Sequence, residues 1–415
     1  MTLVTRRERI FYAAGDTGFN LVWATIELYL LFYYVSVLQV PPYLAGLVFL
    51  VGSIVDLVAD PLLGSWIDRR EGRVSLRRWV ALSAPLIGLA LAATFAGPSM
   101  GLTGFAWLAG TYIVLRLTYS LGNIPYAALT VRMTGDADER IRITATRMQG
   151  AAMGGLIASA VFLLLPLEKN GQNVQAGAII LALASQPLLL ASVAGVRERT
   201  HPRLQGLSSS ALSFFAALRS TPRLSLLLAI IFFAGLSVSI LHSSLLFLFD
   251  RLDGKNTGYG IVIVPALAML TTAPLFGKLA IRIGEATTLL FAVPAFVASL
   301  ALAAFMPPGL WLATTISLAI VFGVGMSTLF WMLVPRVIGE IEDKTASAAA
   351  SKIVGLANLS RKTAQAVTPL AIAAVLSADT SFLPLICMLP AAIAGGAAWL
   401  FARSESRPQK SWGLR

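Results

Sequence analysis

The segment VDLVADPLLGSWIDRREGRVSLRR, residues 55–78, joins an apolar helical pattern that carries two acids to a run of arginines. Asp56 and Asp60 are four residues apart, so on a helix they lie about 40° apart around the axis and about 6 Å apart along it. A carboxylate at membrane depth is costly unless it faces protein, water or a cation. The shared face therefore predicts a cation or proton site, with a structural pairing of one acid with an arginine as the alternative.

The composition is that of a protein that crosses the bilayer many times. Of 415 residues, 57% are hydrophobic and only 13% are charged, against roughly 25% charged residues in soluble domains. About twelve apolar stretches are long enough to span a bilayer. The predicted fold is therefore an all-α membrane protein with twelve transmembrane helices, at residues 11–36, 43–66, 79–97, 103–129, 143–166, 175–196, 224–249, 258–281, 286–306, 310–336, 346–376 and 380–403.

The positions of the basic residues predict the orientation in the membrane. With loops assigned alternately from an inner start, 25 of the 32 Lys and Arg residues fall on the inner side, 3 outside and 4 within spans. This asymmetry follows the positive-inside rule and predicts a multi-pass protein of the bacterial inner membrane with both termini cytoplasmic. The net charge of +12 therefore requires no nucleic acid partner. The first span is too long for the apolar region of a signal peptide, so a retained amino terminus is expected.

An internal repeat predicts two halves. The stretch DPLLGSWIDRREG, which begins at Asp60, recurs as APLFGKLAIRIGE from Ala273. Transporters built from two parallel six-span repeats bind their substrate between the halves. We expect an N-terminal six-helix bundle at residues 1–196, a cytoplasmic linker at 197–223, and a C-terminal six-helix bundle with a cytoplasmic tail at 224–415. Because the second copy has Ala273 where the first has Asp60, a cation site would belong to the first half.

Further charged residues fall within or beside the apolar spans. Glu27 and Arg116 fall at comparable depths and are predicted to pair, either as a structural ion pair or as one that breaks during transport. Arg147 lies in the first turns of its span and is either a snorkelling boundary residue or a donor in a cavity. Arg361 and Lys362 are neighbours about 100° apart on a helix, so one of them is expected to face a cavity.

Lys362 is the natural counter-charge for Asp56 and Asp60 when no external cation is bound. A coupling ion would then change the attraction between the two halves by neutralising the acids.

The inner end of the second span carries a loop motif. Gly64, Asp68, Arg69, Gly72 and Arg73 resemble the GxxxDRxxGR signature of the major facilitator superfamily. Glycine there would permit close helix approach. We expect the acidic and basic side chains to form a gating loop that holds the cytoplasmic side shut, with a merely solvated basic loop as the alternative.

Three elements together resemble the glycoside-pentoside-hexuronide:cation symporter family: DLVADPLLGSWIDRR, IPYAALTVRMT followed by DERIRITATRM, and an isolated mid-membrane lysine. The resemblance covers nearly the whole chain. It implies the major facilitator fold, with two pseudo-symmetric six-helix bundles. It further implies that Asp56 and Asp60 bind the coupling cation, Na⁺ or H⁺, that Lys362 couples to their charge, and that Arg147 lies in the substrate cavity.

Departures from the family pattern bear on the substrate. The two acids that the family uses for sugar fall on Asn20 and Asn123, and the tryptophan that stacks on the sugar ring falls on Ala127. Asparagine still hydrogen-bonds a hydroxyl group, so another glycoside fits. Arg116 and Glu27 are extra charges that would suit a uronate or a lipid headgroup. The candidate substrate-binding residues are therefore Asn20, Asn123, Arg147, Arg116 and Glu27.

The leading function predicted from the sequence is cation-coupled symport of a small polar solute, a sugar or glycoside, by alternating access. The alternatives are sodium-coupled lysophospholipid transport, proton-driven export, and a non-transporting sensor or scaffold. Because no nucleotide-binding loop, metal-ligand set or catalytic triad is found in the sequence, an enzyme and a cofactor other than the coupling ion are not expected. The expected partners are the solute, the cation and the lipid bilayer, and the protein is expected to be a monomer.

Overall fold

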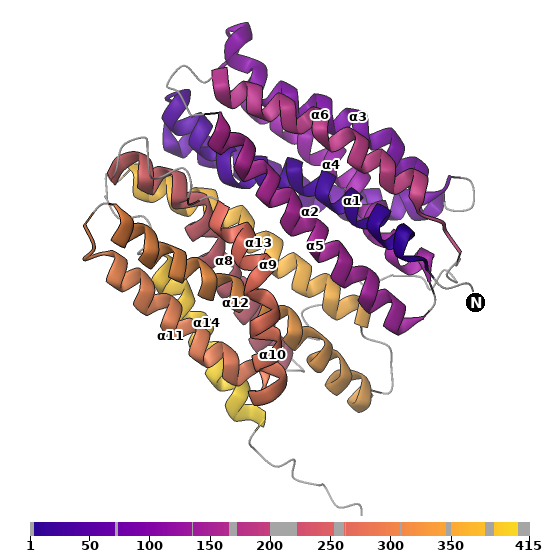
Figure 1. Cartoon of the computed structure of the whole chain (residues 1–415), viewed down its shortest axis with the longest axis vertical. Helices are drawn as coiled ribbons and strands as arrows, with labels where there is room; N and C mark the ends of the chain where they lie inside the picture. Colours follow the sequence, from indigo (N-terminus) through magenta and orange to yellow (C-terminus); the bar gives the residue numbers. More distant parts are fainter. Residues whose placement is uncertain are drawn as a thin grey trace, which may run out of the picture. The chain divides into compact units, whose positions relative to one another are not determined.

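The computed structural model describes residues 4–70, 74–134, 136–165, 172–199, 222–252, 261, 263–307, 309–345, 350–377 and 386–405. These residues form long helices joined by short turns, with no strand among them, which confirms the all-α prediction (Figure 1). The chain forms two compact units. The first takes Met1–Gln205, Leu245–Leu270 and Pro369–Thr380, and the second takes Gly206–Ser244, Thr271–Thr368 and Ser381–Arg415. The predicted domain boundaries at residues 196 and 224 stay a prediction.

Six helices make up the amino-terminal part of the first unit. Helix α1 packs against α5 and α6, α4 packs against α2 and α3, and α3 also packs against α6. The main packing contacts therefore run in the order α5, α1, α6, α3, α4 and α2. Their bounds are α1 Arg6–Ala24, α2 Pro42–Arg69, α3 Leu76–Ala96, α4 Phe105–Met133, α5 Ala137–Leu164 and α6 Gln172–Gly195.

Seven further helices follow among the described residues. They are α8 Pro222–Leu252, α9 Val264–Thr271, α10 Ala273–Ile283, α11 Glu285–Ala303, α12 Leu310–Thr345, α13 Ala350–Ser377 and α14 Met388–Glu405. Within the second unit, α11 packs against α10, α12 and α14. Each of the twelve predicted spans overlaps a described helix when α9 and α10 are taken together. By length and composition, seven described helices could cross a membrane, or eight if α9 and α10 form one bent span.

The helical segment that begins with α1 changes its winding after Ala24. Thr5 caps its start, because its side chain accepts from the Glu8 backbone while the Glu8 side chain accepts from the Thr5 backbone. The α-helix gives way to π-helical turns at Thr25–Leu30 and Tyr33–Val37. Single π-helical turns often occur at functional sites. Glu27, one of the candidate residues, lies in the first of these segments.

Small residues bring α1 and α5 into close contact. A Cβ atom added at Gly150 would clash with the Ala13 carbonyl, and one added at Gly154 would clash with the Thr17 carbonyl. Thr17 Oγ1 donates to the Gly150 carbonyl at 2.9 Å. Glycines four residues apart are a common device for such close helix packing in membranes. Since Arg147 lies one turn before Gly150, this packing fixes Arg147 against α1.

Candidate functional site

Two buried ion pairs of the described residues lie within the predicted spans, and the first, called here the α2–α4 pair, joins α2 to α4. Arg116 Nη2 donates to Asp56 Oδ2, and the two side chains are only 10% and 7% exposed. The guanidinium also lies over the Trp23 ring, 4.9 Å from its centroid, and 5.8 Å from the Tyr112 centroid. Among the described residues, the second oxygen of Asp56, Oδ1, is buried and accepts no hydrogen bond. Arg116 therefore neutralises Asp56 from within the protein.

The predicted partner of Arg116 was wrong. The sequence suggested Glu27, whereas the structure pairs Arg116 with Asp56. Glu27 Oε2 instead accepts from Trp23 Nε1 at 3.0 Å, and the Trp23 ring carries the Arg116 guanidinium. Two acids at similar depth cannot be told apart by depth alone. The structural alternative for the α2 acids, a pairing of one of them with an arginine, describes Asp56.

The second acid of α2 and the predicted counter-charge differ from Asp56 in their surroundings. Asp60 lies one turn further along α2 and is half-buried. Lys362 is half-buried on α13 and belongs to the second unit. Its neighbour Arg361 donates from Nη1 to Gln365 Oε1, one turn along the same helix, at 2.9 Å. Cation binding by the α2 acids and charge coupling to Lys362 stay predictions.

The second buried ion pair joins α1 to α5 and is called here the α1–α5 pair. Arg147 Nε donates to Asp16 Oδ1 at 2.9 Å. Asp16 is 3% exposed, whereas Arg147 is 23% exposed. The Arg147 guanidinium also lies 5.5 Å from the centroid of the Tyr126 ring. Arg147 therefore points at a buried acid of the bundle instead of snorkelling outward.

Sequence reasoning missed Asp16. The family resemblance directed attention to Asn20, whose Nδ2 donates to the Asp16 backbone carbonyl at 2.9 Å. Asp16 lies four residues before Asn20, so the two share a helix face. An acid inside an apolar helix, on the face of a candidate substrate residue, was the available signal. Asn123, the other candidate asparagine, is half-buried on α4, and so is Ala127.

An aromatic column connects the two ion pairs. It is made of Tyr126, Phe19, Tyr119 and Trp23, which come alternately from α4 and α1. Successive ring centroids are 5.0, 5.4 and 5.6 Å apart, within the range of favourable aromatic pairs. The guanidinium of the α1–α5 pair lies against one end of the column and that of the α2–α4 pair against the other. The two pairs thus belong to one continuous polar and aromatic site.

The predicted gating loop begins within the last turns of α2. Gly64, Asp68 and Arg69 lie in the last turns of this helix, Arg69 is exposed, and Arg73 lies outside the described residues. A Cβ atom added at Gly64 would meet no heavy atom of the described chain within 4 Å. The described residues thus show no close helix approach at Gly64, and the gating role of this loop stays a prediction.

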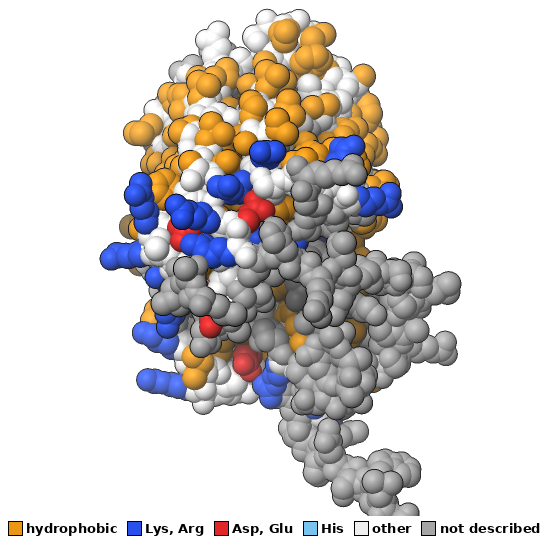
Figure 2. Space-filling model, turned by 90° about the vertical axis from the view of Figure 1, so that its right-hand side faces the viewer, with side chains coloured by type: hydrophobic (Ala, Val, Ile, Leu, Met, Phe, Trp, Pro, Cys, Tyr) orange, Lys and Arg blue, Asp and Glu red, His pale blue; other side chains and the backbone are white. Residues whose placement is uncertain are grey.

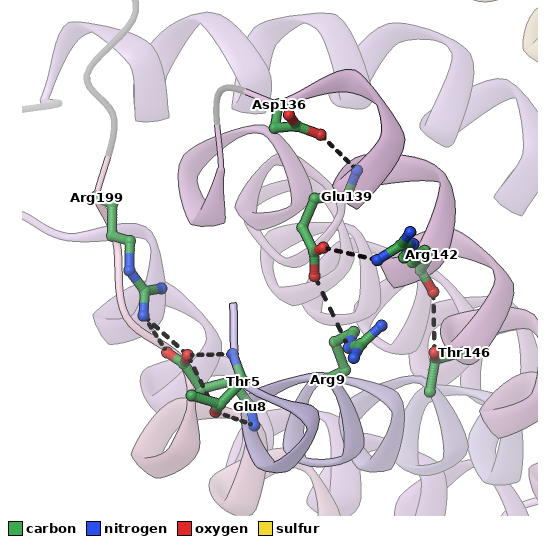
Figure 3. A network of polar contacts seen from close by, with 8 residues as sticks. All are labelled: Thr5, Glu8, Arg9, Asp136, Glu139, Arg142, Thr146 and Arg199. Carbon is green, nitrogen blue, oxygen red and sulfur yellow. Dashed lines mark hydrogen bonds and ion pairs between the residues drawn. The ribbon is translucent and has the colours of Figure 1, made fainter. Parts of the chain in front are cut away.

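A second polar network ties helix ends together outside the predicted spans, and we call it the terminal network (Figure 3). Arg199, which follows α6, donates from Nη2 to both carboxylate oxygens of Glu8 at 3.0 and 2.8 Å. Burial raises the pKa of Glu8, but its hydrogen bonds from Arg199 and Thr5 outweigh burial, and the pKa is lowered from its usual value. The start of α1 is thereby bound to the segment after α6.

The same network also holds the start of α5. Asp136 Oδ1 caps this helix by accepting from the Glu139 backbone at 2.8 Å. The Glu139 carboxylate lies 3.8 Å from Arg9 and 3.9 Å from Arg142. Figure 2 shows Lys and Arg side chains gathered with a few acids on one face, beside a surface dominated by hydrophobic side chains. Such a boundary is typical of a helix bundle that leaves the bilayer.

Known proteins resemble this chain in sequence and in fold. It is 40% identical over 157 residues to the uncharacterized symporter YnaJ of Bacillus subtilis, covering 37% of this chain and 33% of that relative. The isoprimeverose transporter of Lactiplantibacillus pentosus is 28% identical over 207 residues, 48% of this chain and 43% of that relative. These matches span less than half the length of either relative.

Two comparisons extend over most of the chain. The sodium-dependent lysophosphatidylcholine symporter 1 of Mus musculus is 25% identical over 381 residues, 81% of this chain and 70% of that relative. The crystal structure of the nucleoside transporter NupG superposes with a TM-score of 0.69 at 14% identity, covering 97% of this chain and 100% of that one. At this identity the likeness shows the fold alone, and it is the fold of a membrane transporter.

The family profile described as MFS/sugar transport protein matches residues 11–382, which include both ion pairs, the aromatic column and the gating loop. This match agrees with the symporter resemblance drawn from the sequence. The chain therefore belongs to the MFS/sugar transport protein family, whose members are membrane transporters and not enzymes.

Proposed function

We propose that this protein is a secondary active transporter that moves a small polar solute, a sugar or glycoside, by cation-coupled symport. The observation that carries the proposal is the continuous site of two buried ion pairs and an aromatic column inside a chain of the MFS/sugar transport protein family. Charged groups at membrane depth are costly and commonly mark solute or ion pathways.

Solute recognition in this proposal centres on the α1–α5 pair. The Arg147 side chain is 23% exposed, and the half-buried Asn20 donates to the backbone carbonyl of the same acid, Asp16, that Arg147 binds. Arginine presents five donors in a fixed geometry, which suits the hydroxyl oxygens of a sugar. Trp23 and Tyr119 are half-buried and offer ring faces of the kind that stack on sugars. Asn123 and Glu27 complete the proposed set around this site, and Arg116 supports it from behind Trp23 as the partner of Asp56.

The coupling ion, Na⁺ or H⁺, acts in this proposal on the α2 acids, Asp56 and Asp60. Neutralising a buried acid lowers the cost of closing the cavity over it, so ion binding favours the occluded state. Lys362 serves as the counter-charge in the absence of the ion. The gating loop with Asp68, Arg69 and Arg73 holds the cytoplasmic side shut. We place the protein in the bacterial inner membrane as a monomer, with both termini cytoplasmic.

A second candidate function is the uptake of lysophospholipids. It is favoured by the mouse symporter named for lysophosphatidylcholine, because that similarity runs along 81% of this chain. A lipid substrate would use Arg147 for its phosphate. It would enter from the bilayer, whereas a sugar enters from water.

Accumulation in proteoliposomes tests the proposal. Purified protein is reconstituted, and uptake of labelled sugars, uronates and lysolipids is followed under an imposed Na⁺ or proton gradient. We expect cation-driven accumulation of a sugar or glycoside that falls at least about tenfold in Arg147→Gln, since a charged donor to the solute is lost. Asp136→Asn serves as the matched control, because that side chain caps α5 outside the predicted spans.

The alternatives give different results in the same vesicles. Accumulation of lysolipid alone would replace the sugar by the second candidate, and cation-driven efflux would make the protein an exporter. A protein that accumulates none of these solutes, and whose properties are unchanged by Asp60→Asn, would be a sensor or scaffold, and the proposed function would be abandoned.

A further inference from the structure

The α2–α4 pair is assembled from matched turns of its two helices. Tyr112 lies four residues before Arg116 on α4, and Gly52 lies four residues before Asp56 on α2. A Cβ atom added at Gly52 would overlap the Tyr112 ring. The glycine therefore gives room to the ring, and the ring lies against the guanidinium of the neighbouring turn. Gly52, Asp56 and Tyr112 thus shape one compartment for the Arg116 guanidinium.

This compartment provides the Arg116 guanidinium with an opposite charge and two aromatic ring faces, without an external ion. The Asp56 carboxylate supplies the opposite charge, and both side chains are at most 10% exposed. Trp23 and Tyr112 contact the guanidinium through their ring faces, and such contacts strengthen where water is excluded. A buried arginine cannot give up its proton to relieve the charge. Arg116 is therefore a permanent cation on Asp56.

A sodium ion does not fit the same carboxylate. Bound to the remaining oxygen, Oδ1, the ion would share one carboxylate with the guanidinium, so two positive charges would meet one negative charge. Two cations bound to the same carboxylate repel each other strongly where exposure to water is low. To bind Asp56, Na⁺ would first have to displace Arg116 and leave a buried guanidinium without its counter-charge.

We infer that Arg116 is the ion-specificity residue of this protein: its guanidinium takes the place of an inorganic cation at Asp56 and keeps Na⁺ from binding there. The inference rests on the proposed symport, because it narrows which ion acts on the α2 acids. The coupling ion of this transporter is then not a Na⁺ ion held by Asp56. Removal of the guanidinium should convert Asp56 into a carboxylate that Na⁺ stabilises.

Melting of the full-length protein in detergent, followed by tryptophan fluorescence in NaCl or in choline chloride at equal ionic strength, tests the inference without requiring transport. For the wild type we expect equal melting temperatures in both salts. For Arg116→Gln we expect NaCl to raise the melting temperature by at least about 3 °C, because a ligand that binds only the folded state stabilises it. Arg116→Lys, which keeps the charge, should show no Na⁺-specific rise.

A Na⁺-specific rise in the wild type as large as that in Arg116→Gln would overturn the inference, as would a folded Arg116→Gln protein that does not respond to Na⁺. If Arg116→Gln fails to fold, Arg116→Lys and the wild type decide. A Na⁺-specific rise in either then overturns the inference, and its absence in both supports it. A failure of uptake in proteoliposomes would instead count against the proposed function and leave these melting results unaffected.

Discussion

The two buried ion pairs of the first unit differ in their access to solvent. Their acids are almost equally buried, with Asp56 7% and Asp16 3% exposed. Their arginines are not: Arg116 is 10% exposed, whereas Arg147 is 23% exposed. An arginine whose side chain is partly exposed can exchange its acid for water or for a solute at a lower cost than an enclosed arginine can. The same chemical pair can therefore serve as a fixed counter-ion in one place and as an exchangeable contact in another.

The helix contacts around the two pairs differ in the same sense. At the α1–α5 pair, glycines bring the backbones of the two helices together, and the Arg147 side chain remains partly exposed. At the α2–α4 pair, the rings of Trp23 and Tyr112 enclose the guanidinium. The packing around each pair therefore distinguishes the α2–α4 pair, called here the closed pair, from the α1–α5 pair, called here the half-open pair.

The largest expected effect follows from breaking the closed pair. Arg116→Leu leaves Asp56 as an uncompensated buried charge, and losses of about 3 to 5 kcal/mol are typical of such changes. We expect a large fall in melting temperature and in the yield of monodisperse protein. The double variant Asp56→Asn/Arg116→Leu should recover much of the loss, since the charge is then gone. Two fully additive single losses would show that the residues do not act as a pair.

The next effect is the loss of the half-open pair. Asp16→Asn leaves Arg147 without its carboxylate, but the partly exposed Arg147 side chain can turn toward water. We therefore expect a loss of about 1 to 3 kcal/mol, smaller than that for the closed pair, together with a marked fall in solute uptake. Melting temperature and uptake in proteoliposomes measure the two effects. If Asp16→Asn costs as much stability as Arg116→Leu, the difference in exposure has no energetic meaning.

A smaller effect compares the packing behind each pair. In Gly150→Ala the new methyl group meets the Ala13 backbone carbonyl, which cannot move away, whereas in Gly52→Ala it meets the Tyr112 side chain. Overpacking costs roughly 1 to 3 kcal/mol, and we expect Gly150→Ala near the upper end and Gly52→Ala near the lower. Gly110→Ala, with no heavy atom within 4 Å of the new methyl group, is the matched control. The reverse order in melting temperature would contradict this view of the two contacts.

The sequence was sufficient for the all-α fold and drew attention to several buried charges, but it did not identify their partners. The all-α fold followed from the lengths of the apolar stretches, and Asp56, Arg116 and Arg147 stood out as charges within or beside apolar spans. Spacing along one helix says nothing about which residue of another helix lies opposite, so Arg116 was given the wrong acid. Asp16 was missed because attention fell on Asn20, one turn further along the same face. Pairing between helices is decided by packing, which a sequence pattern does not specify.

The smallest expected effect extends the comparison to Glu8 and Arg199 in the terminal network. The pKa of Glu8 is lowered in the folded state, so the folded protein binds fewer protons than the unfolded chain. The stability that Glu8 contributes is therefore present above its unfolded pKa of about 4.3 and is lost as the pH falls through the lower folded value. We expect Glu8→Gln to cost about 1 kcal/mol at neutral pH and little in acid. Glu285→Gln, in the more exposed pair with Arg336, is the control and should change less. Melting curves between about pH 3 and pH 7 measure both, and a Glu8→Gln deficit that grows toward low pH would reverse the assigned direction.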